Sequence, residues 1–425
     1  MNQQNNVAIP IKIKYPDINL RAFFYFLSLG IYMVYSFLSI SFYQNAVISS
    51  GIYILEFCFV LLVIAELTNF EYKRFDLYGI IFIAFIMIVT YIVVGNVWWR
   101  PFLWIVLFAF GARHIQFNKI AKFALIISTF CFAFIILSSV AGVIPDYLDT
   151  TTHLGVTRHY LGFLYCLYAP TVLFNIEALY LYLRAERLKW FELVICIGIA
   201  YVFYRLCDAR LNFILNLLMV IGFCVVKYRK NIPQSIRKNL VNISKMMPWI
   251  FIVCGMVSII LSFGYNESIS WLAKINASLG NRLGYGHISY QRYGLSAFGQ
   301  VISMHGSGLS GNGLRGRGEY FYLDCLYVRF LQEYGIVFSC LMLFALTIVM
   351  YRMVSKKKYY LIIILTVLGL HAMVDDLILL PYYNTFWIVC IYFLVIPQKK
   401  LNSRINIKTR KIEKKKNSIC RNNKK

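Results

Sequence analysis

Residues 77–95 read LYGIIFIAFIMIVTYIVVG, an apolar run without one charged side chain. An α-helix rises 1.5 Å per residue, so about 20 apolar residues cross the roughly 30 Å hydrocarbon core of a bilayer. This stretch therefore predicts a membrane-spanning helix.

Similar runs recur along the chain. Its 425 residues are 60% hydrophobic and only 14% charged, and their mean hydropathy is +0.65, which is too apolar for a set of soluble domains. We therefore expect an all-α polytopic membrane protein with about twelve spans, the first of them retained rather than removed as a leader. The predicted spans cover residues 20–43, 47–66, 77–95, 98–112, 120–143, 161–183, 191–204, 209–226, 248–265, 333–351, 359–380 and 381–396.

The basic residues set the expected orientation. The chain carries 43 Lys and Arg against 18 Asp and Glu. Because Lys and Arg accumulate in cytoplasmic loops, both termini are expected in the cytoplasm, an arrangement that places 33 of the 43 inside. The positive charge thus indicates a membrane surface rather than nucleic acid as its partner.

This orientation divides the chain into segments. Residues 1–19 form a cytoplasmic N-terminus, 20–265 hold spans one to nine, and 333–396 hold spans ten to twelve. Between these spans, residues 266–332 form one large extracytoplasmic loop, and loops of that length usually carry function. Residues 397–425 form a basic cytoplasmic tail.

The basic residues left outside are almost all arginine. Nine of the ten are Arg, the exception being Lys274, whereas Lys predominates inside. A planar guanidinium binds phosphate bidentately, which favours an outer site for a phosphorylated ligand. The competing interpretation is that the bias toward positive cytoplasmic loops simply removes Lys from outer loops.

Four of these arginines are candidate phosphate ligands. Arg158 precedes span six, where it binds either a ligand anion or lipid phosphate. Arg205 and Arg210 flank Asp208 in a short outer turn, and since one carboxylate neutralises one guanidinium, a second anion is expected there. Arg282 lies among glycines early in the long loop, which lets backbone approach a ligand.

Three further residues are candidates for proton transfer. Asp324 precedes span ten and is either a general base at an outer site or a helix cap. His371 and Asp375 are four residues apart in span eleven and share a helix face. They form either a proton-transfer pair or a buried pair that fixes helix packing.

A set of short motifs follows in order along the second half of the chain. They are R-x-x-LGF at 158–163, DARLNFIL at 208–215, NRL at 281–283, Y-x-D-x-x-Y at 322–327, EYGI at 333–336, and H-x-x-x-D-D at 371–376 with Asn384. The ordered set resembles Wzy-type oligosaccharide repeat-unit polymerases, which belong with the O-antigen ligases to one superfamily of membrane glycosyltransferases.

The resemblance implies a GT-C-like fold and an outer active site in the cytoplasmic membrane. Such enzymes polymerise undecaprenyl-diphosphate-linked oligosaccharides, as donor and acceptor, into capsule, exopolysaccharide or O-antigen, working beside a flippase and a chain-length regulator. It implies that Arg210 and Arg282 hold the diphosphate, that Arg158 assists, and that Asp324 is the base. Two positions depart from the family pattern, Cys325 after that Asp and Ala209 before the turn Arg.

No cofactor is expected, and the lack of an outer Asp-x-Asp motif predicts transfer without a metal. Two alternatives remain open. A ligase would use the same donor without extending it, and a flippase of the same pathway would move repeat units across the membrane, since twelve spans are common in carriers.

Overall fold

The computed structural model describes residues 20–68, 74–150, 155–229, 231–316 and 318–395. The predicted cytoplasmic N-terminus, 1–19, and the predicted basic tail, 397–425, lie outside the described residues.

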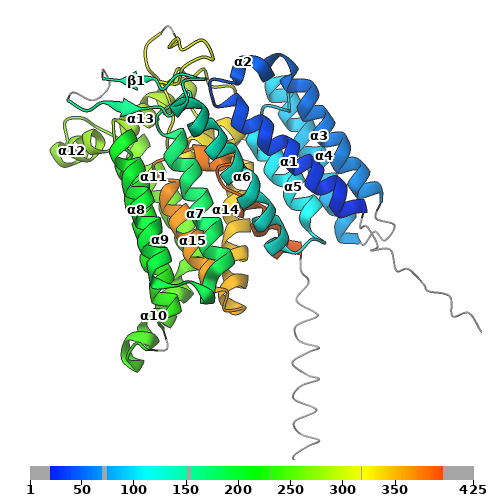
Figure 1. The fold of residues 1–425 in the computed structure, drawn as a ribbon, viewed down its shortest axis with the longest axis vertical. Coiled ribbons are helices and arrows are strands. Elements are labelled where there is room, and N and C mark those ends of the chain that lie inside the picture. The colour runs from blue at the N-terminus through cyan, green and yellow to red at the C-terminus, as the bar shows by residue number, and fades with distance from the viewer. Residues whose placement is uncertain (1–19, 69–73, 151–154, 230, 317, 396–425) are drawn as a thin grey trace, which may run out of the picture.

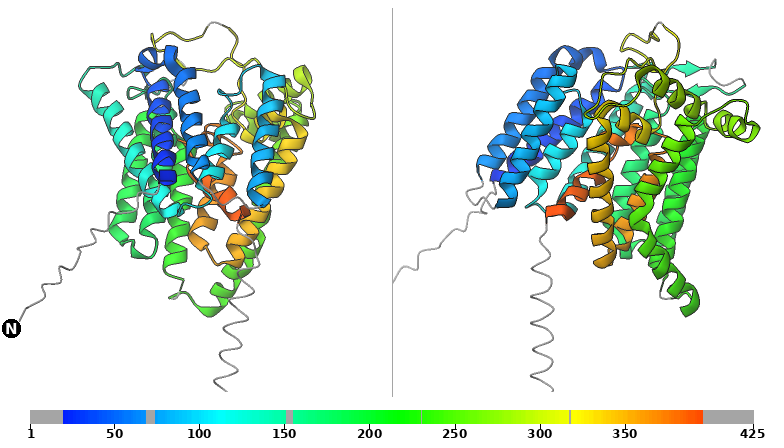
Figure 2. Two further views of the ribbon diagram at one scale, coloured as in Figure 1. Left: turned by 90° about the vertical axis from the view of Figure 1, so that its right-hand side faces the viewer. Right: turned by 180° about the vertical axis from the view of Figure 1, so that it is seen from behind.

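The described chain is mostly helical (Figures 1 and 2). Two short strands, β1 (Leu148–Asp149) and β2 (Arg158–His159), pair antiparallel, with Leu148 opposite His159. The 3₁₀ turns are η1 (Ile48–Ser50), η2 (Ala185–Arg187), η3 (Met247–Trp249) and η4 (Leu377–Leu379). The α-helices are α1 (Leu20–Ser39), α2 (Gln44–Val47), α3 (Gly51–Leu67), α4 (Arg74–Val94), α5 (Pro101–Ala112), α6 (Phe117–Val140), α7 (Tyr168–Arg184), α8 (Trp190–Cys207), α9 (Arg210–Lys227), α10 (Gln234–Met246), α11 (Ile250–Phe263), α12 (Ser270–Ser278), α13 (Arg282–Tyr293), α14 (Leu326–Ser355), α15 (Tyr359–His371) and α16 (Phe386–Val395).

Among the described residues, eight helices are long and apolar enough to cross a membrane. The prediction of an all-α polytopic membrane protein is thereby confirmed. Each of the twelve predicted spans overlaps a helix, but α5, α7, α15 and α16 are not among these eight. That all twelve cross the bilayer, in a GT-C-like arrangement, stays a prediction.

The segments predicted to be outside meet at one end of the bundle. Asn45 donates a hydrogen bond to Asn312 at 2.6 Å, and Arg315 pairs with Asp149 at 2.6 Å. Figure 1 shows α2, β1, α12 and α13 at this end and α10 at the other. We call the first the outer end, following the predicted orientation.

A buried ion cluster lies at the inner end. The Arg113 side chain is fully buried, binds Asp76 at 2.6 Å and also binds Glu66, which Arg21 approaches at 3.2 Å. These contacts join α1, α3 and α4 to the residue after α5. The cluster therefore holds the ends of these four helices together, and the side of the membrane that they face stays a prediction.

The last two helices are interrupted where the sequence predicts continuous spans. Helix α15 ends at His371 and α16 begins at Phe386, and residues 372–385 between them are largely buried and not α-helical. Backbone of this kind is tolerated at membrane depth only where protein satisfies its polar groups. Here the Leu377 amide donates to Asp375 at 2.9 Å, and the Thr385 amide donates to Asn175 on α7 at 3.2 Å.

Helix α14 is broken at Gly335, where φ is 84° and ψ is 174°. The amides of Ile336 and Val337 donate instead to the carbonyls of Ser296 and Ala297, both at 3.0 Å. The large outer loop is thus tied into the helix break. The helix also begins at Leu326, before the predicted start of span ten at 333.

Replacing Gly335 by alanine is expected to destabilise the protein by roughly 2–5 kcal/mol. The added Cβ would lie 2.3 Å from the Gly299 nitrogen, at a φ that side chains rarely adopt. Gly198, on α8, is the matched control because its Cβ would meet nothing within 4 Å. The midpoint of thermal unfolding in detergent should be lower for Gly335→Ala than for Gly198→Ala. Equal midpoints would show that the contact between the outer loop and the break in α14 does not stabilise the protein.

Candidate functional site

A cavity of about 240 Å³ lies among the segments of the outer end. Its walls come from the start of α7, the first residue of α13, the loop before α14 and the segment after α15. The lining residues are Tyr165, Leu167, Tyr168, Arg282, Gly306, Ser307, Gly308, Leu309, Tyr320, Tyr322, Asp324, Asp375, Asp376 and Leu377. The interrupted segment 372–385 therefore brings two carboxylates, those of Asp375 and Asp376, to the cavity wall.

Arg282 and Asp324 face each other in this cavity. The Arg282 Nε lies 3.4 Å from Asp324 Oδ2, and the two side chains are 16% and 17% exposed. They come from the two ends of the large loop, 42 positions apart in sequence. The structure therefore brings together one predicted phosphate ligand and the predicted base.

The position of Arg282 is fixed by the turn that precedes it. Gly280 and Asn281 both have positive φ, which reverses the chain between α12 and α13. The Asn276 side chain then accepts hydrogen bonds from the amides of Leu283 and Gly284, both at 3.0 Å. Because these bonds satisfy the first turn of α13, its first side chain is held at the cavity wall.

Asp324 is not the cap of α14. That position belongs to Cys325, and the Leu326 amide donates to the carbonyl of Ala372 at 2.9 Å. Burial raises the pKa of the Asp324 carboxyl to about 6, while the Arg282 guanidinium opposes this rise and Asp375 adds to it. A carboxyl with such a pKa exchanges its proton near neutral pH, as a general base must.

His371 and Asp375 are in contact as predicted, with His371 Nε2 3.1 Å from Asp375 Oδ2, but they do not share a helix face because α15 ends at His371. Asp375 lines the cavity and also accepts a hydrogen bond from Thr171 at 3.2 Å. His371 is fully buried behind it, with its ring edge-on to Phe174. Of the two, only Asp375 faces the space where a ligand could bind.

A second set of charges, which the motifs did not single out as a unit, adjoins the cavity. Arg329 binds Asp376, donates to the Tyr322 hydroxyl at 2.9 Å, and lies 3.3 Å from Glu333. Arg100, at the start of α5, binds the other oxygen of Glu333 at 3.1 Å. We call these five residues the buried ion network.

Two signals for this network were present in the sequence. Arg329 and Arg100 were among the few outer basic residues, and Asp376 ended the H-x-x-x-D-D motif. Their pairing joins positions 100, 329 and 376, and no local pattern predicts contacts between segments so far apart.

The other three predicted phosphate ligands do not line the cavity. Arg158 is buried on β2 and donates from Nε to the Cys207 carbonyl at 3.0 Å. Arg205 is exposed on α8. Arg210 pairs with Asp208 at 3.0 Å and its side chain is 67% exposed. The four arginines therefore do not converge on this cavity, and a diphosphate-binding role for these three stays a prediction.

The comparisons with known proteins leave the family open. No family model, no curated protein and no solved structure matches the chain.

Proposed function

We propose that the chain is a membrane glycosyltransferase that polymerises lipid-diphosphate-linked oligosaccharides at its outer end. The observation that carries the proposal is the Arg282–Asp324 pair in a cavity bounded by tyrosines and carboxylates. The ordered motifs that resemble repeat-unit polymerases support the same reaction.

The cavity walls suit a saccharide. Tyr165, Tyr168 and Tyr320 line the cavity, and aromatic rings are the groups against which the apolar C–H faces of a sugar ring pack. Asp375 and Asp376 offer oxygens that accept hydrogen bonds from sugar hydroxyls. The non-reducing end of the acceptor glycan would therefore lie between these groups.

The proposed reaction uses Asp324 and Arg282 together. The acceptor hydroxyl oxygen attacks the anomeric carbon of the donor glycan as Asp324 takes the hydroxyl proton. The bond from that carbon to the carrier diphosphate breaks, and its electron pair leaves with the diphosphate oxygen. Arg282 stabilises the charge that builds on this oxygen, which is most effective in a site with little water.

One guanidinium thus serves two anions in turn. Arg282 is the main group that lowers the pKa of Asp324. When the donor diphosphate draws Arg282 away, the proton affinity of the Asp324 carboxylate rises. Donor binding would therefore strengthen the base at the moment when the acceptor must be deprotonated.

The pH dependence of the reaction follows from this base. Because the raised pKa of Asp324 is about 6, the deprotonated form dominates above that pH. We expect kcat/KM to rise with pH, reach half its maximum near pH 6 and level off above it. Initial rates measured from pH 4.5 to 8 test this; an acid limb near pH 4, as for an ordinary aspartate, would contradict it.

The accumulation of substrate in cells that lack the chain separates the proposal from its alternatives. Loss of a polymerase should leave single lipid-linked repeat units that an external lectin or glycosidase reaches in intact cells. Loss of a flippase leaves the units inaccessible until the cells are opened. Loss of a ligase leaves lipid-linked chains that are already extended, and either of the last two outcomes would overturn the proposal.

A further inference from the structure

We propose that two adjoining cavities at the inner end bind one anionic phospholipid, with its headgroup in the first and an acyl chain in the second. The first, which we call the basic cavity, has a volume of about 470 Å³ and lies among the end of α7, the turn between α14 and α15, and α16. The second, which we call the α10 cavity, is also about 470 Å³ and lies between α9, α10 and α15. Because α10 is at the end opposite the outer cavity (Figure 1), this inference does not depend on the proposed reaction.

Positive charge predominates in the basic cavity. Arg229 and the consecutive residues Lys356, Lys357 and Lys358 line it, together with the carboxylate of Glu186. Burial and the positive charges of its neighbours lower the pKa of Lys356. The described lining thus carries an excess of positive charge, which a headgroup with a net negative charge would offset.

The turn that carries the three lysines is fixed by its own backbone and by α16. The amide of Lys358 donates to the carbonyl of Met353 at 2.9 Å, and Lys357 has a φ of 54°, so the turn closes the end of α14. The Lys356 ammonium lies 5.1 Å from the centre of the Phe393 ring on α16. The lysines are therefore held at the cavity wall.

Arg229 lies where the two cavities meet, since it lines both of them together with Val226 and Tyr359. Its Nη1 donates to the Val226 carbonyl at 2.6 Å, and its Nη2 donates to Glu186 at 3.1 Å. The guanidinium carbon lies 5.7 Å from the centre of the Tyr359 ring. A guanidinium has five N–H donors, more than these two bonds use, so Arg229 can also bind a phosphate at the boundary.

The wall of the α10 cavity is mainly apolar. Gly222 lets α9 approach α15 closely, because an added Cβ would lie 2.6 Å from Ile363. Both residues line the cavity, and Leu240 and Val241 of α10 line it as well. Such a wall favours hydrocarbon. A molecule that joins a phosphate to a hydrocarbon chain can therefore occupy both cavities at once.

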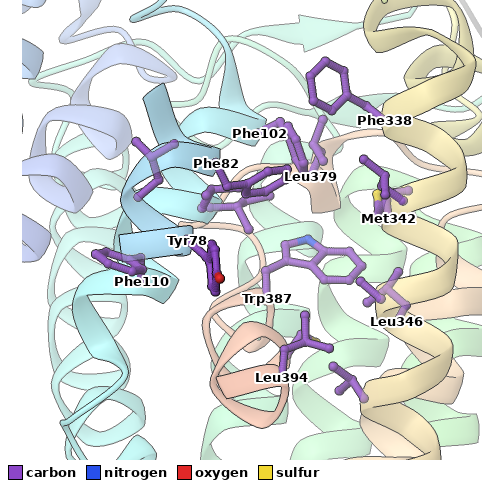
Figure 3. Close-up of a pocket in the computed structure, with 18 residues that line it drawn as sticks. Tyr78, Phe82, Phe102, Phe110, Phe338, Met342, Leu346, Leu379, Trp387 and Leu394 are labelled. Atoms are coloured by element: carbon purple, nitrogen blue, oxygen red, sulfur yellow. The ribbon is translucent and has the colours of Figure 1, made fainter. Parts of the chain in front are cut away.

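Helix α16 contributes to two cavities of opposite character. Val389 and Phe393 line the basic cavity. Trp387 and Leu394 point into a different cavity of about 290 Å³, and no charged side chain is among the described residues that line it (Figure 3). A phosphate is therefore expected on the side of α16 that faces the lysines.

Charge and setting select the occupant. Basic pockets between the helices of membrane proteins bind anionic headgroups, and the adjoining α10 cavity favours a lipid over free phosphate. The amine of a zwitterionic headgroup would be repelled by the same lysines. The ends of the chain itself are poor candidates, because residues 1–19 and 396–425 both contain more Lys and Arg than Asp and Glu.

Native mass spectrometry of the full-length protein in a neutral detergent tests the inference. Phosphatidylglycerol or phosphatidylcholine is added, with or without inorganic phosphate, and the fraction of lipid-bound protein is measured. We expect phosphatidylglycerol to bind at least about tenfold more tightly than phosphatidylcholine and to resist displacement by an equal concentration of inorganic phosphate. Equal affinities for the two lipids, or displacement by inorganic phosphate, would overturn the proposal.

A matched pair of double variants tests the headgroup site. Lys356→Gln with Lys358→Gln should weaken the binding of phosphatidylglycerol by about 25-fold, since each basic residue near an anionic headgroup contributes about fivefold. Lys238→Gln with Lys245→Gln removes two charges from exposed positions of α10 that line neither cavity, and it should leave the affinity unchanged. Equal affinities of the two double variants would refute the headgroup site.

A second pair tests the site of the acyl chain. Val241→Trp places a large ring in the α10 cavity from an exposed position, and it should weaken the binding of phosphatidylglycerol at least about fivefold. Asn242→Trp adds the same ring at the next position of α10, outside the lining, and should not. If Val241→Trp binds this lipid as tightly as Asn242→Trp does, the acyl chain does not lie in the α10 cavity.

Discussion

Replacing Asp324 by asparagine is expected to lower the rate of polymer formation by about 100- to 10,000-fold, the usual contribution of a general base. Asparagine keeps the shape of the side chain but does not accept the proton of the acceptor hydroxyl. The substitution also removes the carboxylate partner of the Arg282 guanidinium, so some loss of stability is expected beside the loss of rate. The measurement is kcat in reconstituted vesicles, together with the thermal midpoint of the purified variant.

Glu319→Gln is the matched control for that variant. Glu319 is an exposed carboxylate in the same loop, five positions earlier, and it does not line the cavity. We expect its activity to stay within about twofold of the native rate, since surface substitutions have small effects. A native rate in Asp324→Asn, with the fold intact, would remove Asp324 from the chemistry.

Arg329→Met should destabilise the protein by about 3–5 kcal/mol, the cost of leaving buried partners of an ion pair uncompensated. Arg329 contacts both Asp376 and Glu333, whose side chains are 4% and 8% exposed. Its loss leaves the Asp376 carboxylate without its guanidinium partner, while Glu333 keeps its contact with Arg100. The measurement is the thermal midpoint in detergent, with retention of the monodisperse protein peak after heating.

Two comparisons show whether the loss comes from uncompensated charge. Arg329→Met combined with Asp376→Asn removes that carboxylate and should recover part of the lost stability. Arg210→Met removes an exposed guanidinium and should leave the midpoint unchanged. A midpoint for Arg329→Met equal to that of Arg210→Met would show that the network does not hold the outer end together.

The membrane fold could be predicted from apolar runs such as residues 77–95, since a helix of that length matches the thickness of the hydrocarbon core of a bilayer. The interruption between His371 and Phe386 could not. Residues 359–396 are apolar enough to suggest two helices, but part of the backbone of the interruption is satisfied by Asn175 on α7, 210 positions away from Thr385. Such a contact belongs to tertiary structure, which hydropathy does not encode.

Only part of the candidate site could be predicted from the sequence, and the reason is similar. Arg282 and Asp324 were chosen by residue type and motif, and they meet in one cavity. By residue type, Arg158 and Arg210 were equally good candidates for phosphate ligands. One is buried against a backbone carbonyl and the other is exposed beside Asp208, because each follows the packing of its own turn. Residue type predicts what a side chain can bind, whereas the fold decides what it faces.

The most direct test of the central claim is the product made by the purified protein from one synthetic lipid-diphosphate oligosaccharide repeat unit. In proteoliposomes that contain EDTA, the account predicts a ladder of lipid-linked chains, and it predicts that Arg282→Lys, which keeps the charge but loses the bidentate fork, makes little or none. No ladder from the native protein, or a full ladder from Arg282→Lys, would contradict it.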